Sequence, residues 1–217
     1  MRYTARDTRI STVKNFKGDV NMYEKLRENL KRKRIGFKYF ENREQAAAYL
    51  TETLKGEKIA FGGSVTLQEM GLYEKLRENN EVYWHWIEKK DEQREIEAAL
   101  TTYILSANAV AETGEIVNID GTGNRVANAI YGPSKVFYVV GENKICENLH
   151  SAIDRARNIA APLNAKRLGL STPCAADGKC HDCASEQRIC NAMTVIMSKP
   201  GKIQLCEVIV IGEKLGY

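Results

Sequence analysis

The chain has 217 residues, of which 43% are hydrophobic and 28% are charged, and its net charge is +4. This length and balance predict a globular protein with a sizeable core and exclude a disordered or fibrous chain. No apolar run is long enough to cross a bilayer and the N-terminus lacks a signal-peptide pattern, so we expect a cytoplasmic protein with no membrane partner. The basic run Lys31–Arg34 lacks interleaved aromatic residues, so we expect no nucleic-acid partner either.

The first part of the chain combines a polar arm with helix and strand patterns. Residues 1–20 have no sustained periodicity and are interpreted as an N-terminal arm, which leaves 21–217 as a single domain. Residues 21–34 predict a helix because apolar residues recur at helical spacing. A strand is expected at 37–40. The segment Asn42–Leu54 is predicted to be a helix that begins with a capping box.

The next stretch places two glycines between a strand and a helix. Residues Lys58–Phe61 predict a short buried strand, Gly62 and Gly63 break it, and a helical pattern runs from Val65 through Leu76. Such a loop can bind an anion, because glycines let the backbone approach a ligand and the first N–H groups of the helix point at it. The same residues also suit an ordinary turn with Ser64 as the N-cap.

The aromatic segment Glu81–Ile87 is predicted to be a strand, with Trp84 and Trp86 on one face. His85, on the other face, is interpreted as a packed histidine. Residues 91–106 follow as a long predicted helix.

A second glycine-rich loop lies between apolar segments and a helix. Short strands are expected at 109–111 and 116–119, and the loop Asp120–Arg125 opens a helix at 126–130. Neither glycine loop forms the dinucleotide fingerprint or a Walker sequence, so we expect no nicotinamide cofactor and no nucleotide triphosphate hydrolysis.

Strands and helices continue to alternate, with a strand at 135–141 and a helix at 147–161 that Pro162 is expected to end. This alternation predicts an α/β fold with a Rossmann-like, largely parallel sheet and helices on both faces. Ligands bind at the carboxyl ends of strands in such sheets, and both glycine loops are expected there.

Four of the six cysteines lie within 17 residues, spaced C-x5-C-x2-C-x6-C. In a reducing compartment this pattern favours a metal site over disulfides, with the ligands Cys174, Cys180, Cys183 and Cys190. An iron–sulfur cluster and zinc both fit the spacing, and His181 could replace one cysteine in a zinc site. The alternative is a set of free or regulatory thiols. Cys146 and Cys206 are interpreted as small apolar core residues.

Several longer strings resemble the LUD (lactate-utilisation) domain family, formerly a domain of unknown function. They are FGGSVTLQEMGL at 61–72, TGEIVNIDGTGNRVA at 113–127, VVGENKI at 139–145, AAPLNAKRL at 160–168 and the cysteine run at 172–191. The cysteine run matches a subgroup of short, single-domain members.

The resemblance implies a fold similar to ribose-5-phosphate isomerase, CoA transferases and methenyltetrahydrofolate synthetase. It further implies that Gly62, Gly63, Ser64 and Thr66 hold an anionic group. Glu115, Asp120, Asn124 and Arg125, with Gly121 of the same loop, would line the opposite wall of the ligand site, and Glu115 is the candidate catalytic residue. Several family members are tied to oxidation of L-lactate to pyruvate alongside larger iron–sulfur partners. The chain has no appended ferredoxin-type domain, so an accessory role is expected rather than autonomous lactate oxidation.

Three functions follow as hypotheses. The first is a lactate-utilisation protein that binds a small carboxylate or phosphorylated metabolite and works with electron-transfer partners through an iron–sulfur centre. The second is an isomerase or acyl/CoA-transferase-like enzyme in which Glu115 is the base or nucleophile and zinc is structural. The third is a non-catalytic module that senses a metabolite or redox state. The helix at 21–34 is a candidate surface for a homo-oligomer, and the sequence leaves the oligomeric state open.

Overall fold

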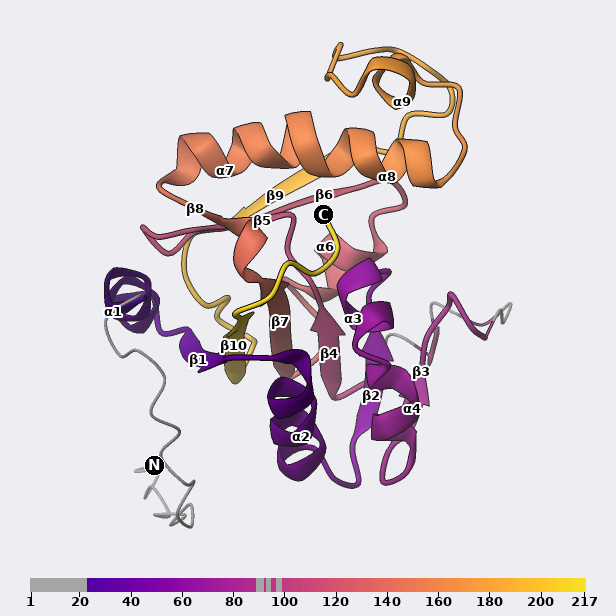
Figure 1. Cartoon of the computed structure of the whole chain (residues 1–217). Coiled ribbons are helices and arrows are strands. Elements are labelled where there is room, and N and C mark those ends of the chain that lie inside the picture. Colours follow the sequence, from indigo (N-terminus) through magenta and orange to yellow (C-terminus); the bar gives the residue numbers. More distant parts are fainter. Residues whose placement is uncertain (1–22, 89–91, 93–94, 97–98) are drawn as a thin grey trace.

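The computed structural model describes residues 23–88, 92, 95–96 and 99–217, and it is built on a six-stranded sheet in the order β1-β10-β7-β4-β2-β3 (Figure 1). Every neighbouring pair in this sheet is parallel, as the alternation of strands and helices predicted. The strands are β1 Gly36–Phe40, β2 Lys58–Phe61, β3 Glu81–Tyr83, β4 Thr102–Leu105, β7 Lys135–Gly141 and β10 Leu205–Ile211.

Helices cover both faces of this sheet because successive side chains of each strand point to opposite sides. In β7, Val136 and Tyr138 join a core with α1, and Phe137 joins the core on the other face. The helices of that other face are α2 (Arg43–Thr53), α3 (Val65–Glu69) and α4 (Leu72–Arg77), while α1 (Glu24–Arg32) and the end of α6 (Asn124–Asn128) lie against the first face. The predicted α/β architecture is confirmed.

A second, four-stranded sheet lies beyond the carboxyl ends of the main strands (Figure 1). Its order is β8 (Ile145–Cys146), β5 (Ala109–Ala111), β6 (Ile116–Asp120) and β9 (Ala192–Ile196). The short turn at 112–115 forces β5 and β6 into an antiparallel hairpin. The expectation that both glycine loops end strands of one parallel sheet is therefore wrong, because the second loop follows β6.

One long helical element covers the outer face of the second sheet. It comprises α7 (Leu149–Arg155), a π-helical stretch (Ala156–Ala160) and α8 (Ala161–Arg167). The expected end at Pro162 is wrong, since the helix continues through the proline. The wide π-helical turn immediately before it accommodates a residue that has no N–H to donate. Ala152 and Ala156 of this element pack on the hairpin strands.

The segment from 81 to 106 differs most from its prediction. β3 ends at Tyr83, and residues 84–87 form turns rather than strand. The prediction of a long helix at 91–106 is wrong at its C-terminal end. Thr102–Leu105 forms the fully buried strand β4, which lies between β7 and β2. Short apolar runs fit a helix and a buried strand equally well, and tertiary pairing decided here. Part of 91–106 lies outside the described residues.

Local end signals were more reliable. The side chains of Asn42 and Ser64 cap α2 and α3, as predicted. The helix expected from Val65 through Leu76 is broken at Gly71, whose φ of 57° starts the separate helix α4. The predicted N-terminal arm at 1–20 lies outside the described residues. Across the described part of the chain, no helix is long and apolar enough to span a membrane.

Candidate functional site

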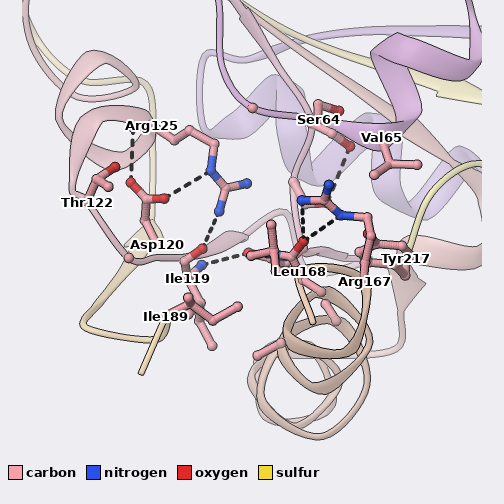
Figure 2. A pocket seen from close by; sticks show the side chains of 18 of the residues that line it. Ser64, Val65, Ile119, Asp120, Thr122, Arg125, Arg167, Leu168, Ile189 and Tyr217 are labelled. Carbon is pink, nitrogen blue, oxygen red and sulfur yellow. Dashed lines mark hydrogen bonds and ion pairs between the residues drawn. The ribbon is translucent and has the colours of Figure 1, made fainter. Parts of the chain in front are cut away.

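A cavity of about 230 Å³ lies where the second sheet and α8 approach the carboxyl ends of β2, β4 and β7 (Figure 2). We call it the glycine-loop cavity. The first glycine loop (Gly62-Gly63-Ser64) and the second (Gly121-Thr122-Gly123) both contribute to its wall. Carboxyl ends of parallel strands are the usual place for ligands in α/β proteins. The cavity therefore occupies the position expected of a binding site.

Close packing explains the first glycine loop. A Cβ on Gly63 would lie 2.7 Å from Nε1 of Trp86, and a Cβ on Gly62 would lie 3.2 Å from Cγ of Arg125. A side chain at position 63 would therefore displace the indole, and one at position 62 would press Arg125 aside by a few tenths of an ångström. Ser64 is buried, and its hydroxyl accepts a hydrogen bond from the backbone N–H of Leu67.

The second glycine loop carries an ion pair into the cavity. Nε of Arg125 lies 3.2 Å from Oδ1 of Asp120, and the backbone N–H of Arg125 donates to the other carboxylate oxygen. A further guanidinium N–H donates to the carbonyl of Ile119, as the dashed lines in Figure 2 show. A guanidinium has five N–H donors, so these two side-chain bonds fix its orientation and leave further donors for a ligand.

Lys144 is a second basic side chain in the wall, and no local pattern in the sequence indicates it. The side chain is buried, and its Nζ donates to Oγ1 of Thr66 at 2.9 Å and to Oγ of Ser106 at 3.0 Å. Burial, followed by the positive charges of Arg155 and Arg125, lowers the pKa of Lys144 to about 7. Near neutral pH this amine is protonated only in part.

A third cation lies on the opposite wall. The guanidinium of Arg167 in α8 lies 5.0 Å from the ring centroid of Trp86 and donates to Oδ1 of Asn164 (Figure 2). Trp86 in turn stacks on Trp84 at 5.5 Å. His85, which the sequence reading treated as a packed residue, also lines the cavity. The turn after β3, expected to be strand, thus supplies part of the wall.

One polar atom in the wall, Nδ2 of Asn124, is buried without a hydrogen-bond partner among the described residues. An unsatisfied buried donor costs about 1–3 kcal/mol, so such a group calls for a ligand or a water molecule. This amide can donate to the oxygen of an anion.

The structure brings most of the predicted ligand-binding residues together. Those that line the cavity are Gly63, Ser64, Asp120, Gly121, Asn124 and Arg125. Gly62 lies directly behind Arg125, and Thr66 lies beneath the wall as the partner of Lys144. The site residues that the sequence reading missed include Ser106, Lys144 and Arg167. Lys144 and Arg167 lie in the strings VVGENKI and AAPLNAKRL. The resemblance of these strings to the family was the signal that could have pointed to both residues.

Glu115, the catalytic candidate, lies elsewhere. It belongs to the turn between β5 and β6, where Nζ of Lys33 contacts its Oε1 at 2.8 Å and Thr113 donates to its other oxygen. Burial raises the pKa of Glu115, but the hydrogen bonds from Lys33 and Thr113 outweigh it and leave the pKa below its ordinary value. Glu115 does not line the glycine-loop cavity, and its contacts join α1 to the hairpin.

The four clustered cysteines lie in what we call the cysteine loop, residues 172–191, beyond α8. Arg188 organises this loop, because its guanidinium donates to the carbonyls of Cys183 and Cys190 and to Oδ1 of Asp182. A second cavity, of about 290 Å³, is lined by Cys180, Cys190 and Arg157, among others. Nη2 of Arg157 lies 3.7 Å from Sγ of Cys180.

As folded, the cysteine loop does not fit a complete metal centre. Among the described residues, no three side chains of Cys, His, Asp or Glu gather closely enough to hold a metal ion. His181, the alternative ligand, contacts Asp177 at 2.8 Å. A cluster or a zinc ion at the four cysteines requires these side chains to rearrange.

Fold and cavity together define a Rossmann-like α/β protein with a cation-rich pocket at the carboxyl edge of its parallel sheet. The family model of the LUD domain matches residues 23–211. The chain therefore belongs to the LUD domain family, as the strings in its sequence indicated.

One solved structure agrees at the level of the fold. A crystal structure of a DUF162 family protein from Deinococcus radiodurans is similar, with 12% identity, a TM-score of 0.52, and coverage of 87% of this chain and 94% of that one. A crystal structure of eIF2B beta from Chaetomium thermophilum has 16% identity and a TM-score of 0.36, and covers 50% of this chain and 44% of its own. A comparison with curated proteins gave no match.

Proposed function

We propose that the protein binds a small anionic metabolite, a carboxylate or a phosphate ester, in the glycine-loop cavity. The guanidinium groups of Arg125 and Arg167 and the partly protonated amine of Lys144 line a space whose described wall holds one carboxylate side chain, that of Asp120. This convergence is the observation that carries the proposal, because an excess of positive charge in a partly enclosed space favours an anion. Membership of the LUD family supports a role for the protein in the oxidation of lactate to pyruvate.

The size of the cavity limits the ligand. Pockets for drug-sized molecules have volumes on the order of 300–1,000 Å³, and this cavity has about 230 Å³. A three- or four-carbon acid or a small phosphate ester is the class that fits. The planar fork of Arg125 suits a carboxylate, which it can bind through two parallel hydrogen bonds.

Binding by the full chain can be measured by isothermal titration calorimetry with L-lactate, pyruvate and inorganic phosphate as separate probes. We expect at least one of them to bind. Arg167→Met should weaken that binding about 10- to 100-fold, which corresponds to a charge-assisted hydrogen bond of about 1.5–3 kcal/mol. Arg167 has an exposed side chain, so its loss should leave the fold intact.

The matched control is Lys166→Met. Lys166 is the neighbour of Arg167 on α8, is exposed and does not line the cavity. The Lys166→Met variant removes the same net charge from the same helix as Arg167→Met. Its affinity for the anion should therefore stay within about twofold of the wild type. Equal losses of affinity in both variants would show that Arg167 acts only through its net charge. Absence of binding by every probe would refute the proposal.

An iron–sulfur centre at the four cysteines remains part of the lactate hypothesis as a prediction. The proposed anion binding does not involve this centre. As folded, the described cysteine loop does not gather three metal ligands. Iron and acid-labile sulfide, measured in protein purified without oxygen, would support an electron-transfer partner. The isomerase or transferase hypothesis with Glu115 as the base draws no support from the site, since Glu115 is paired with Lys33 outside the cavity.

A further inference from the structure

Lys144 is the one lysine that is buried among the described residues. It ends the 3-10 turn Glu142–Lys144 directly after β7, is 3% exposed and lines the glycine-loop cavity. Lys33 and Lys135 each pair with a glutamate. Lys144 takes part in none of the ion pairs found in the described part of the chain, which is unusual for a buried cation.

The contacts of Lys144 suit a neutral amine. Its two hydrogen-bond partners are hydroxyls, Thr66 Oγ1 and Ser106 Oγ, which come from α3 and from the end of β4. A neutral amine has two N–H groups and one lone pair, so these two bonds use both donors. The third direction of the tetrahedral nitrogen is left to the lone pair, and a lone pair makes the amine a nucleophile.

Charges around the amine favour the same state. Arg155 and Arg125 both disfavour protonation, and Glu69 is the carboxylate that opposes them. Glu69 is engaged elsewhere, since its Oε2 accepts the backbone N–H of Gly216 at 2.8 Å. Gly216 also keeps the space beside the amine open, because a Cβ there would lie 3.3 Å from Nζ of Lys144.

We propose that Lys144 forms an imine with the carbonyl carbon of a small 2-oxo carboxylate held in the glycine-loop cavity. The proposal rests on the anion binding proposed above and narrows its ligand class. Such an acid has its ketone or aldehyde carbon next to the carboxylate, so a carboxylate held by Arg125 presents the carbonyl within the same cavity.

The step balances without a co-reactant. The lone pair of Nζ attacks the carbonyl carbon to form the C–N bond, and one N–H proton moves to the oxygen to give a carbinolamine. The nitrogen lone pair then forms the C=N bond as the C–O bond breaks, and the oxygen takes the remaining N–H proton and leaves as water, so that a neutral imine and one water molecule result. The hydroxyls of Ser106 and Thr66 lie within hydrogen-bond distance of Nζ and can hold and pass these protons.

The test is reductive trapping. The full chain is incubated with pyruvate, treated with sodium borohydride and digested, and the adduct is located by mass spectrometry. We expect one reduced pyruvate adduct on Lys144, absent from Lys144→Met. Lys135→Met, which removes a lysine paired outside the cavity, should leave the adduct unchanged. Excess inorganic phosphate, which has no carbonyl, should suppress the adduct by competition.

A second variant keeps the amine and alters only its surroundings. Ser106→Ala removes one hydroxyl partner, and we expect trapping at Lys144 to slow about tenfold. Pyruvate that binds by calorimetry but leaves adducts only on exposed lysines, or none at all, overturns the imine and leaves anion binding intact. Absence of binding by pyruvate, lactate and phosphate overturns both proposals.

Discussion

The glycine-loop cavity and the cysteine loop lie on two sides of one wall. Ile119 and Ala161 line both cavities, and the neighbours Ile189 and Cys190 face one cavity each. Yet the two regions are built differently. Lys144 bonds residues 38 and 78 positions away in the sequence. The contacts of Arg188 in the cysteine loop span at most six positions.

This difference separates a site held by long-range contacts from a loop ordered mainly by short-range ones, which Arg157 and Asn191 tie to the rest of the chain. The polar groups of the glycine-loop cavity are held by strands of two sheets, so they cannot shift without disturbing the core. The four cysteines are partly exposed and belong to a loop with little regular structure, so their side chains can rearrange at low cost. Substitutions in the two regions should therefore have effects of very different size.

The largest effect is expected for Arg125→Met. It leaves the buried carboxylate of Asp120 without its cation, and breaking such a pair costs about 3–5 kcal/mol. We expect that loss in the free energy of unfolding by urea, together with loss of anion binding.

The double variant Arg125→Met/Asp120→Asn separates the two losses. Removal of the carboxylate charge should restore at least half of the lost stability, while anion binding stays absent. A double variant that recovers affinity would mean that Arg125 acts on the fold alone.

How far the sequence predicted this site depended on the type of signal. The first glycine loop was recognisable because glycines, a serine cap and flanking patterns all lie within seven residues, and Gly63 and Ser64 do line the cavity. Lys144 was missed because nothing local distinguishes it from an ordinary surface lysine. Its burial and its two hydroxyl partners arise only when β2, β4 and β7 pair.

The pH dependence of stability should show the second largest effect. The pKa of Lys144 is about 7 in the folded chain, below its ordinary value of 10.5. Between these values the unfolded chain binds more protons, so Lys144 makes folding more favourable as the pH rises, by up to about 1.4 kcal/mol per pH unit. Lys144→Met should lack this contribution.

The free energy of unfolding is measured with urea at several pH values for the wild type and for Lys144→Met. Subtracting one from the other removes the contributions of other titrating groups. The charges that act on Lys144 are those of Arg155, Arg125 and Glu69. A difference independent of pH between 7 and 9 would contradict the lowered pKa.

The same contrast between local and long-range signals explains the fold. The strand Lys135–Gly141 was predicted with its observed bounds because the five residues between its ends are all β-branched or aromatic. The strand Thr102–Leu105 was taken for the end of a helix, since so short a run does not distinguish the two. The second sheet was missed because strand pairing across a hairpin depends on a turn that the sequence only suggested.

A smaller effect is expected for Gly63→Ala. The new Cβ would overlap Nε1 of Trp86 at 2.7 Å, so the indole must move away from the wall. Such overpacking costs about 1–3 kcal/mol, and the anion affinity should fall about tenfold as Arg167 loses its stacking partner.

Gly201→Ala is the control, because a Cβ there meets nothing within 4 Å and needs no left-handed backbone. Its stability should stay within about 0.5 kcal/mol of the wild type. Tryptophan fluorescence reports the displaced indole directly. An unchanged spectrum in Gly63→Ala would show that the loop, rather than Trp86, yields to the methyl group.

The smallest effect on stability, and the clearest on dynamics, is expected for Arg188→Gln in the cysteine loop. The variant removes the bonds to the carbonyls of Cys183 and Cys190, yet global stability should change by less than about 1 kcal/mol. Alkylation of these two thiols should become several-fold faster, as measured by mass spectrometry after timed iodoacetamide treatment. Glu186→Gln, an exposed change in the same loop, should leave the rates unchanged.

Cys206 provides an internal reference in both variants. It is buried in β10, and burial raises the pKa of its thiol to about 12, so it should stay unmodified while the protein is folded. Modification of Cys206 together with the loop thiols would mean that Arg188→Gln opens the whole domain. The cysteine loop would then depend on the same long-range packing as the glycine-loop cavity. Faster alkylation confined to the loop would instead confirm that its order is local and that its thiols are free to rearrange around a metal.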